Sequence, residues 1–233
     1  VNTTCRRCHG PAKRETDTLD TFVCSSWYYL RYLDPHNSDK PFDKAITDRY
    51  MPVDKYIGGV EHAAMHLLYA RFIYKALRDM GYVSGDEPFQ SLIHQGTILG
   101  SDGQKMSKSL GNTVMADEYV SKYGSDVFRT YLGFGFSYTE GGPWSDDGIL
   151  AINKFFQKIS KVFENFSNLQ KSDYNAVDEE LEVWLHKTIK SVTSDMENFQ
   201  FNTSIARLME LTSAISKYQS KHDRNFEQEQ QTE

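Results

Sequence analysis

The sequence lacks several features that would place it in other classes of protein. It contains no run of about 20 apolar residues that could span a bilayer, and no basic segment followed by an apolar one opens the chain. Cysteine is scarce: Cys5, Cys8 and Cys24 are an odd number with one CxxC pair, which does not suit a disulfide framework. These absences argue against membrane and secreted classes, and we expect a cytoplasmic protein.

An excess of basic charge is also missing, because 26 Lys and Arg residues face 32 Asp and Glu residues, a net charge of -6. Proteins that rely on contacts with phosphates usually carry a basic patch. Any RNA partner would therefore need a local cationic surface. Six basic residues could supply one, or could form a solvated helix face instead: Lys105, Lys108, Arg129, Lys154, Lys158 and Lys161.

Hydrophobic patterns in the first part of the chain alternate between strand and helix. A short apolar segment at 55–57 ends at Gly58 and Gly59, and a helical pattern over residues 60–80 follows, with Ala64, Leu67, Leu68, Ile73 and Leu77 at helical spacing. Gly81 is well placed to end this helix. Residues 91–99 have the pattern of a returning strand. This order predicts an α/β fold with part of a Rossmann-like, doubly wound parallel sheet.

Strand patterns disappear after Trp144, and residues 146–222 have helical periodicity throughout. The first of these helices has an apolar face, made of Ile149, Ile152, Phe155, Phe156, Ile159, Val162 and Phe163. Two further helices are predicted at about 178–199 and 203–221. We therefore expect two domains, an α/β domain at 1–145 and an all-α helical bundle at 146–233.

The run Lys105-Met106-Ser107-Lys108-Ser109 lies in a glycine-bearing loop after the predicted returning strand. Lysines offer positive charge to phosphate oxygens and serines offer hydroxyl donors, while Gly103 and Gly111 would allow the loop to change shape. This combination suits a polyphosphate ligand. A surface loop rich in lysine and serine is the alternative that composition alone leaves open.

A second candidate segment runs from Tyr56 to His66, where a pair of glycines precedes the predicted helix. Backbone without side chains can approach a ligand closely, and a helix N-terminus favours negative or hydrogen-bonding groups. Glu61 could accept hydrogen bonds from ribose hydroxyls. His62 and His66 lie one helical turn apart, but the HExxH order and a third ligand are missing, so we expect polar cleft residues and no metal.

A third candidate segment, residues 15–32, is dense in aromatic side chains. Phe22, Trp27 and Tyr28 could form the walls of an apolar slot with Asp20 at its rim. The alternative is that these aromatic residues simply belong to the hydrophobic core.

The extended string around Lys105 to Ser109, from Gly96 to Asn112, resembles the second signature of class I aminoacyl-tRNA synthetases. The segments 58–72 and 15–32 resemble those of the leucyl-tRNA synthetase family. The resemblance implies that Lys105, Met106, Ser107, Lys108 and Ser109 form a loop that clamps the pyrophosphate of ATP. Lys108 would stabilise phosphate charge while the leucine carboxylate attacks the α-phosphorus.

The same resemblance implies roles for the other two segments. Gly58, Gly59 and Glu61 would face the adenosine, with His66 beside them, and Phe22, Tyr28 and His62 would contact the leucine side chain. ATP with magnesium, leucine and tRNA(Leu) would be the ligands. A pocket of this kind separates side chains that differ by one methylene by only about 1–3 kcal/mol, which explains why the family adds an editing domain.

The chain departs from the family pattern, because no His-x-Gly-His string occurs in it. The first half of the nucleotide fold, the editing domain and the rest of the anticodon-binding region are also unrepresented. We therefore expect a fragment or one part of a split enzyme that is inactive alone and needs its missing N-terminal half. Synthetases for isoleucine, valine or methionine, and a non-catalytic RNA-binding module, are the alternatives.

Cys5 and Cys8 resemble half of a Cys₄ zinc knuckle, within a segment, 1–16, that is predicted to form a knuckle-like turn. Zinc would require a second pair of ligands from outside this chain. Otherwise the two residues are free thiols. Cys24 receives no role.

Overall fold

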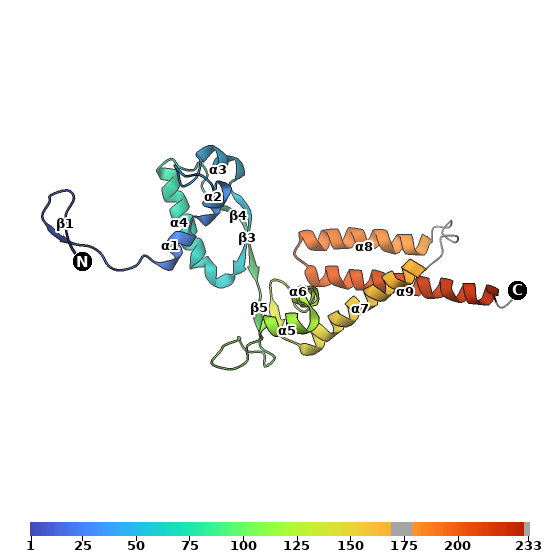
Figure 1. The fold of residues 1–233 in the computed structure, drawn as a ribbon. Helices are drawn as coiled ribbons and strands as arrows, with labels where there is room; N and C mark the ends of the chain where they lie inside the picture. Colours follow the sequence, from blue (N-terminus) through green and yellow to red (C-terminus); the bar gives the residue numbers. More distant parts are fainter. Residues whose placement is uncertain (169–178, 231–233) are drawn as a thin grey trace. The chain divides into compact units, whose positions relative to one another are not determined.

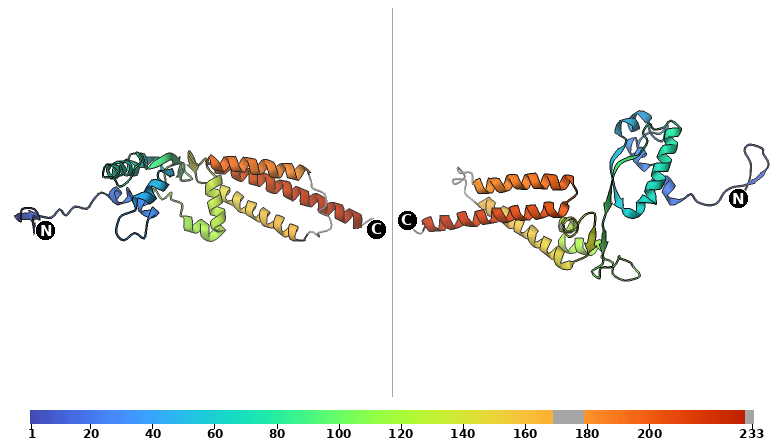
Figure 2. Two further views of the ribbon diagram at one scale, coloured as in Figure 1. Left: turned by 90° about the horizontal axis from the view of Figure 1, so that it is seen from above. Right: turned by 180° about the vertical axis from the view of Figure 1, so that it is seen from behind.

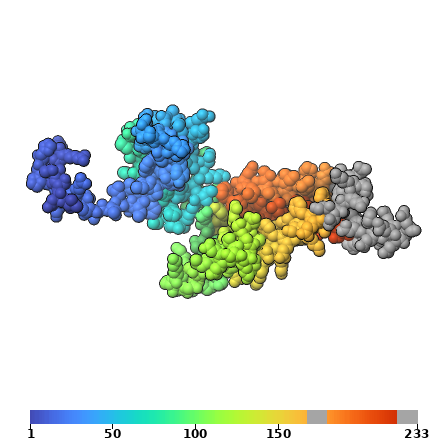
Figure 3. All heavy atoms as spheres, viewed as in Figure 1, coloured from blue at the N-terminus to red at the C-terminus, as the bar shows by residue number. Residues whose placement is uncertain are grey.

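The computed structural model describes residues 1–168 and 179–230 and divides into two compact units, Val1–His94 and Gln95–Glu233. Figure 1 colours the chain from blue in the first unit to red at the end of the second, and Figure 3 shows the heavy atoms in the same colours. Each unit has a hydrophobic core of its own.

The first unit begins with a hairpin of β1 (Asn2–Thr4) and β2 (Pro11–Lys13), which pair antiparallel with Asn2 opposite Lys13. The turn between them is held by two backbone hydrogen bonds: Cys5 N donates to Gly10 O at 2.9 Å, and His9 N donates to Cys5 O at 2.8 Å. The predicted knuckle-like turn is therefore confirmed.

The remainder of the first unit mixes short helices with one strand pair. The helices are α1 (Thr21–Ser25), α2 (Tyr28–Leu33), α3 (Lys44–Tyr50) and α4 (His66–Asp79), with a 3₁₀ turn, η1 (Val60–Ala63). Strand β3 (Val53–Gly59) is hydrogen-bonded to β4 (Phe89–Gln95). The core contains Tyr29, Leu30, Phe42, Ala70, Tyr74 and Val83.

The helix predicted over residues 60–80 is observed in two pieces. Met65, with φ -112° and ψ -100°, separates η1 from α4, so the regular helix begins only at His66. The buried residues of α4 are His66, Leu67, Ala70 and Tyr74. The prediction that Leu68 shares this apolar face is wrong. Leu68 is 59% exposed, because it lies beside the buried face of α4 rather than on it.

The predicted C-terminal stop of this helix is confirmed. Gly81 adopts φ 81°, a left-handed conformation that glycine adopts without a Cβ penalty. Gly81 N donates to Arg78 O at 2.8 Å and Tyr82 N donates to Leu77 O at 2.9 Å, which satisfies carbonyls that the helix leaves free at its end.

The second unit opens with β5 (Thr97–Leu99), which pairs in parallel with β6 (Gly141–Pro143). Between them lie α5 (Ala116–Tyr123) and α6 (Ser125–Phe134). The α/β class is confirmed. The single returning strand predicted over 91–99 is wrong, since Gly96 separates β4 from β5 and the two strands join different sheets. Among the described residues, each strand pairs with one other strand, so the sheets are two-stranded.

Three long helices complete the second unit: α7 (Asp146–Asn168), α8 (Glu179–Glu197) and α9 (Phe201–Gln230). Helix α8 packs along α9, joined to it by a turn in which Phe199 has φ 58° (Figure 2). Both α6 and α7 contact α9 as well. Among the described helices, none combines the length and apolar character needed to cross a bilayer.

The core of this unit is built from α6, α7 and the segment between them, and it contains Val127, Tyr131, Phe136, Trp144, Ile149 and Ile152. The predicted apolar face of α7 is confirmed at Ile149 and Ile152, both fully buried. Phe163 departs from that prediction, because the residue is 69% exposed.

Candidate active site

Helix α1 places Phe22 next to the start of α4. Asp20 caps this five-residue helix, its carboxylate accepting a hydrogen bond from Phe22 N at 2.9 Å. The half-buried Phe22 ring then lies 6.2 Å from the His66 ring and 5.7 Å from the Tyr69 ring, centroid to centroid. The local capping of α1 therefore directs an aromatic side chain onto α4.

Tyr28, the first residue of α2, also lies next to His66. Its ring centroid is 6.2 Å from that of His66, and 41% of the residue is exposed, so part of the ring is open to a ligand. Trp27 does not join it: its ring packs against the core beside Phe42, at 6.5 Å. The slot proposed from three aromatic residues is thus reduced to Phe22 and Tyr28.

His62 completes this group from η1. Its ring meets the Phe22 ring edge-on at 6.4 Å, and the His66 ring at 6.4 Å. The Nδ1 atom is buried and has no hydrogen-bond partner among the described residues. A buried polar atom without a partner is costly, so this nitrogen is available for a ligand group. The proximity of His62 and His66 matches expectation, although no continuous α-helix joins them.

The two glycines at the end of β3 lie beside Glu61. A Cβ atom built on Gly59 would meet the Glu61 carboxylate at 2.3 Å, so this carboxylate lies directly over the glycine backbone. Gly58 lies between the rings of Tyr56 and His62, which a Cβ atom would meet at 3.4 and 3.9 Å. Glu61 is exposed.

Both ring nitrogens of His66 have partners inside the first unit. Nδ1 lies 2.8 Å from the Tyr56 hydroxyl, and Nε2 lies 2.8 Å from the carbonyl oxygen of Ser25. The Tyr56 ring stacks on the His66 ring at 5.6 Å. Burial, with a smaller contribution from neighbouring Tyr28, raises the pKa of Tyr56. Tyr56 opens the candidate segment 56–66, and the sequence pattern predicts no role for it.

The second unit carries the loop Lys105–Ser109, which we call the lysine–serine loop. A β-bridge pairs Leu99 with Lys105, and Gly100 N donates to Gln104 O at 2.8 Å, so the loop leaves β5 through a tight turn. Gly103 and Gly111 have φ of 74° and 66°, which explains glycine at both positions.

Asn112 holds the centre of this loop through its side-chain amide. Its Oδ1 accepts from Ser107 N at 2.8 Å, and its Nδ2 donates to Asp102 Oδ2 at 3.1 Å and to Lys105 O at 3.4 Å. The hydroxyls of Ser107 and Ser109 lie 2.7 Å apart. Asp102 and Asn112 therefore organise the loop, and neither was predicted as a site residue.

The two lysines of the loop point away from the protein interior, whereas Met106 does not. Lys105 and Lys108 are exposed, while the half-buried Met106 packs against the core of the second unit. The loop thus has an apolar anchor and two cationic side chains free to meet an anionic ligand. Phe22, Tyr28, His62 and His66 belong to the first unit and the loop to the second.

Cys5 and Cys8 lie in the hairpin turn as free thiols. Backbone N–H groups of Cys8 and Arg7 lower the pKa of Cys5, as does the side chain of Cys8. A structural zinc ion takes four ligands. No cluster of three His, Cys, Asp or Glu residues occurs among the side chains that the structure describes.

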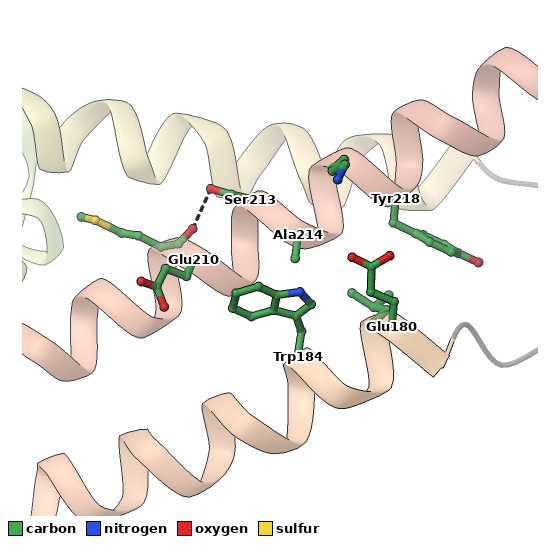
Figure 4. A pocket seen from close by; sticks show the side chains of 9 residues that line it. Glu180, Trp184, Glu210, Ser213, Ala214 and Tyr218 are labelled. Carbon is green, nitrogen blue, oxygen red and sulfur yellow. Dashed lines mark hydrogen bonds between the residues drawn. The ribbon is translucent and has the colours of Figure 1, made fainter.

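A groove of about 680 Å³ lies between α8 and α9, and none of the predicted site residues lines it. Figure 4 shows the Trp184 indole between these helices, below Ser213 and Ala214. The predicted basic stripe is exposed at all six positions, and Lys158 donates to Ser213 Oγ at 2.8 Å. Neither feature identifies a ligand.

Solved structures of aminoacyl-tRNA synthetases share this fold. The ternary complex described as Agrobacterium radiobacter K84 agnB2 LeuRS-tRNA-LeuAMS has a TM-score of 0.84 and 39% identity, over 94% of this chain and 30% of that chain. Methionyl-tRNA synthetase of Mycobacterium tuberculosis bound by methionyl-adenylate has a TM-score of 0.59 at 19% identity, over 87% of this chain and 40% of that one. The fold is therefore that of an aminoacyl-tRNA synthetase catalytic region.

A sequence model of the family described as tRNA synthetases class I (I, L, M and V) matches residues 2–141, more than half of the chain. The chain belongs to this family. It is 60% identical over 231 residues to leucine--tRNA ligase of Clostridium beijerinckii, and 58% identical over 233 residues to that of Clostridium perfringens strain SM101. It spans only 28% and 29% of the lengths of these relatives.

Proposed function

We propose that this chain supplies part of the active site of a leucine--tRNA ligase, which activates leucine with ATP and transfers it to tRNA(Leu). The observation that carries the proposal is the group of Phe22, Tyr28 and His62, whose ring centroids lie 6.2, 6.2 and 6.4 Å from that of His66, within a chain similar to leucine enzymes. Phe22 and Tyr28 would contact the leucine side chain through their rings. The unpartnered Nδ1 of His62 would meet a polar group at the rim of the pocket.

The lysine–serine loop would bind the phosphates of ATP. Lys105 and Lys108 are exposed cations, and Ser107 and Ser109 present hydroxyl donors, with Met106 as the anchor. Lys108 would stabilise negative charge on the phosphates during attack by the leucine carboxylate. Gly58, Gly59, Glu61 and His66 are proposed for the adenylate side. Magnesium would enter with ATP as part of that substrate.

Transfer to tRNA is proposed for the full-length protein, in which residues 146–233 would begin the anticodon-binding bundle. Helix α7 begins at Asp146, whereas the compact units of the structure divide between His94 and Gln95. The six exposed basic residues support contact with phosphates, and the remainder of the catalytic region, together with the editing domain, is the expected partner. Because all three cysteines are free thiols, we also propose a cytoplasmic location.

Amino-acid-dependent pyrophosphate exchange tests the proposal, with this chain in its full-length protein. We expect exchange with leucine and not with isoleucine, valine or methionine. Lys108→Ala should lower kcat about 100-fold, the size typical of losing one preorganised charge-stabilising group. Lys40→Ala, which removes an exposed lysine from the first unit, is the matched control and should retain the rate.

Exchange driven by another amino acid would assign the chain to a different synthetase of the same family. Exchange that survives Lys108→Ala would remove the role given to that lysine. If no amino acid supports exchange, a non-catalytic RNA-binding module becomes the better interpretation.

A further inference from the structure

We propose that Tyr56 and His66 are positioning residues that hold helix α1, and with it Phe22, in place against the leucine pocket. The inference deepens the proposed function and rests on it for the identity of the ligand. The evidence is a chain of two hydrogen bonds across three elements: the Tyr56 hydroxyl on β3, the ring of His66 on α4, and the Ser25 carbonyl at the end of α1.

The direction of these hydrogen bonds follows from the chemistry of the partners. The carbonyl oxygen of Ser25 can only accept, so Nε2 of His66 carries hydrogen and donates across 2.8 Å. In the neutral imidazole, Nδ1 then has a free lone pair and accepts from the Tyr56 hydroxyl at 2.8 Å. The Ser25 carbonyl therefore fixes the tautomer of His66, and the Tyr56 hydroxyl supports it by donating to the nitrogen that this tautomer leaves without hydrogen.

Helix α1 needs such a restraint because it is only five residues long. The Phe22 carbonyl accepts from Ser25 Oγ at 3.2 Å, whereas the carbonyl of Ser25 itself is met by the His66 ring from α4. An isolated helix of this length does not persist in water. The Asp20 carboxylate secures the first turn, and the His66 ring secures the C-terminal end. Both ends of the element that carries Phe22 are thus held by side chains.

The same geometry limits what His66 can offer to a ligand. The residue is 7% exposed and both nitrogens are already bonded within the chain, which leaves the face and edge of the ring. The Phe22 ring contacts that ring at 6.2 Å and the His62 ring at 6.4 Å. A shift of α1 would therefore move one wall of the pocket relative to His62.

Three variants of the full-length protein test the inference by leucine-dependent pyrophosphate exchange. Tyr56→Phe keeps the ring stacked and removes only the hydroxyl; we expect the KM for leucine to rise about fivefold, as for one lost hydrogen bond, with an unchanged KM for ATP. His66→Gln keeps a donor that can reach Ser25, whereas His66→Asn is one carbon shorter. The KM for leucine should rise less in His66→Gln than in His66→Asn.

Hydrogen exchange of the unliganded protein gives a second readout that does not depend on catalysis. Tyr56→Phe and His66→Asn should speed exchange at the amides of Val23 and Ser26, which are hydrogen-bonded within and at the end of α1. Tyr50→Phe removes the hydroxyl of a tyrosine that is 59% exposed, and it should change neither readout.

The two proposals fail in different ways. If hydrogen exchange at the α1 amides is unchanged in both Tyr56→Phe and His66→Asn, the positioning role is overturned, whatever the substrate is. Equal KM values for His66→Gln and His66→Asn overturn the part assigned to the Ser25 carbonyl. If the unmodified protein shows no exchange of pyrophosphate with leucine while α1 still loosens in the variants, positioning stands and the leucine assignment fails.

Discussion

Asn112 shows how a single amide can shape a loop of charged residues. One side of the amide accepts from Ser107 N, and the other donates to Asp102 and to Lys105 O. Aspartate at this position would retain the acceptor but lose the donor and place a second negative charge beside Asp102. Only asparagine, with both functions on a short side chain, suits all three partners.

Replacing Asn112 with alanine should therefore loosen the loop without altering the leucine pocket. Each lost hydrogen bond contributes about 0.5–1.5 kcal/mol, so we expect the KM for ATP to rise about tenfold or more while the KM for leucine stays constant. Pyrophosphate exchange by the full-length protein measures both constants. Asn2→Ala, at an exposed position of β1, is the control. A parallel rise in both KM values would contradict a loop-specific role.

The residues of the site differ in how far sequence could predict them. The lysine–serine loop is contiguous, and its string of residue types identified it without a structure. The hydrogen bond from His66 to Ser25 joins positions 41 residues apart, and no local pattern encodes such a pairing. The roles of Tyr56, Asp102 and Asn112 emerged only from the folded geometry.

At the level of elements, ion pairs join α4 to the segment before β4: Arg71 and Lys75 of the helix both pair with Glu87, and we call these three residues the ion group. Arg71 Nε donates to Glu87 Oε2 and Arg71 Nη2 donates to Glu87 Oε1, each at 2.8 Å. Lys75 Nζ lies 2.9 Å from Glu87 Oε1. Hydrogen bonds first from Arg71 and then from Lys75 lower the pKa of Glu87 to about 2. The carboxylate side chain is 41% exposed, so solvent screening keeps the stabilisation small, at about 0.5–1 kcal/mol.

The variant Glu87→Gln should lose this stabilisation in a pH-dependent manner. Because the folded pKa lies below the unfolded value of about 4.3, the ion group stabilises the fold fully above that pH and loses its effect as pH falls towards 2. The difference in unfolding free energy between the chain and the variant should therefore narrow below pH 4.5. Chemical denaturation across pH 7 to 3.5 measures it, with Glu164→Gln as an exposed control. A constant difference would contradict the assignment.

Elements were predicted well where periodicity was long and poorly where one residue interrupts it. The three helices after Trp144 were expected, since their apolar spacing extends over many turns. The break at Met65 and the division of the strand pattern at Gly96 were not expected, because each depends on a backbone change at a single position. Helical spacing alone carries no information about such local changes.

At the scale of the whole molecule, the two units have separate cores. Leu30 is fully buried in the first core, and Ile149 is fully buried in the second. No residue belongs to both clusters among the described parts of the chain. The proposed leucine pocket depends on the first core, and the lysine–serine loop, anchored by Met106, depends on the second.

This separation predicts that a cavity in one core destabilises one unit alone. Leu30→Ala and Ile149→Ala should each lower local stability by about 2–4 kcal/mol, which corresponds to at least about 30-fold faster amide exchange in the affected unit. Hydrogen exchange followed by mass spectrometry should show the loss for Leu30→Ala in α4, with α6 and α7 still protected. Ile149→Ala should give the opposite pattern. Equal loss of amide protection in both units for either variant would mean that the two cores unfold together. The proposed leucine pocket and the lysine–serine loop would then have the same free energy of unfolding.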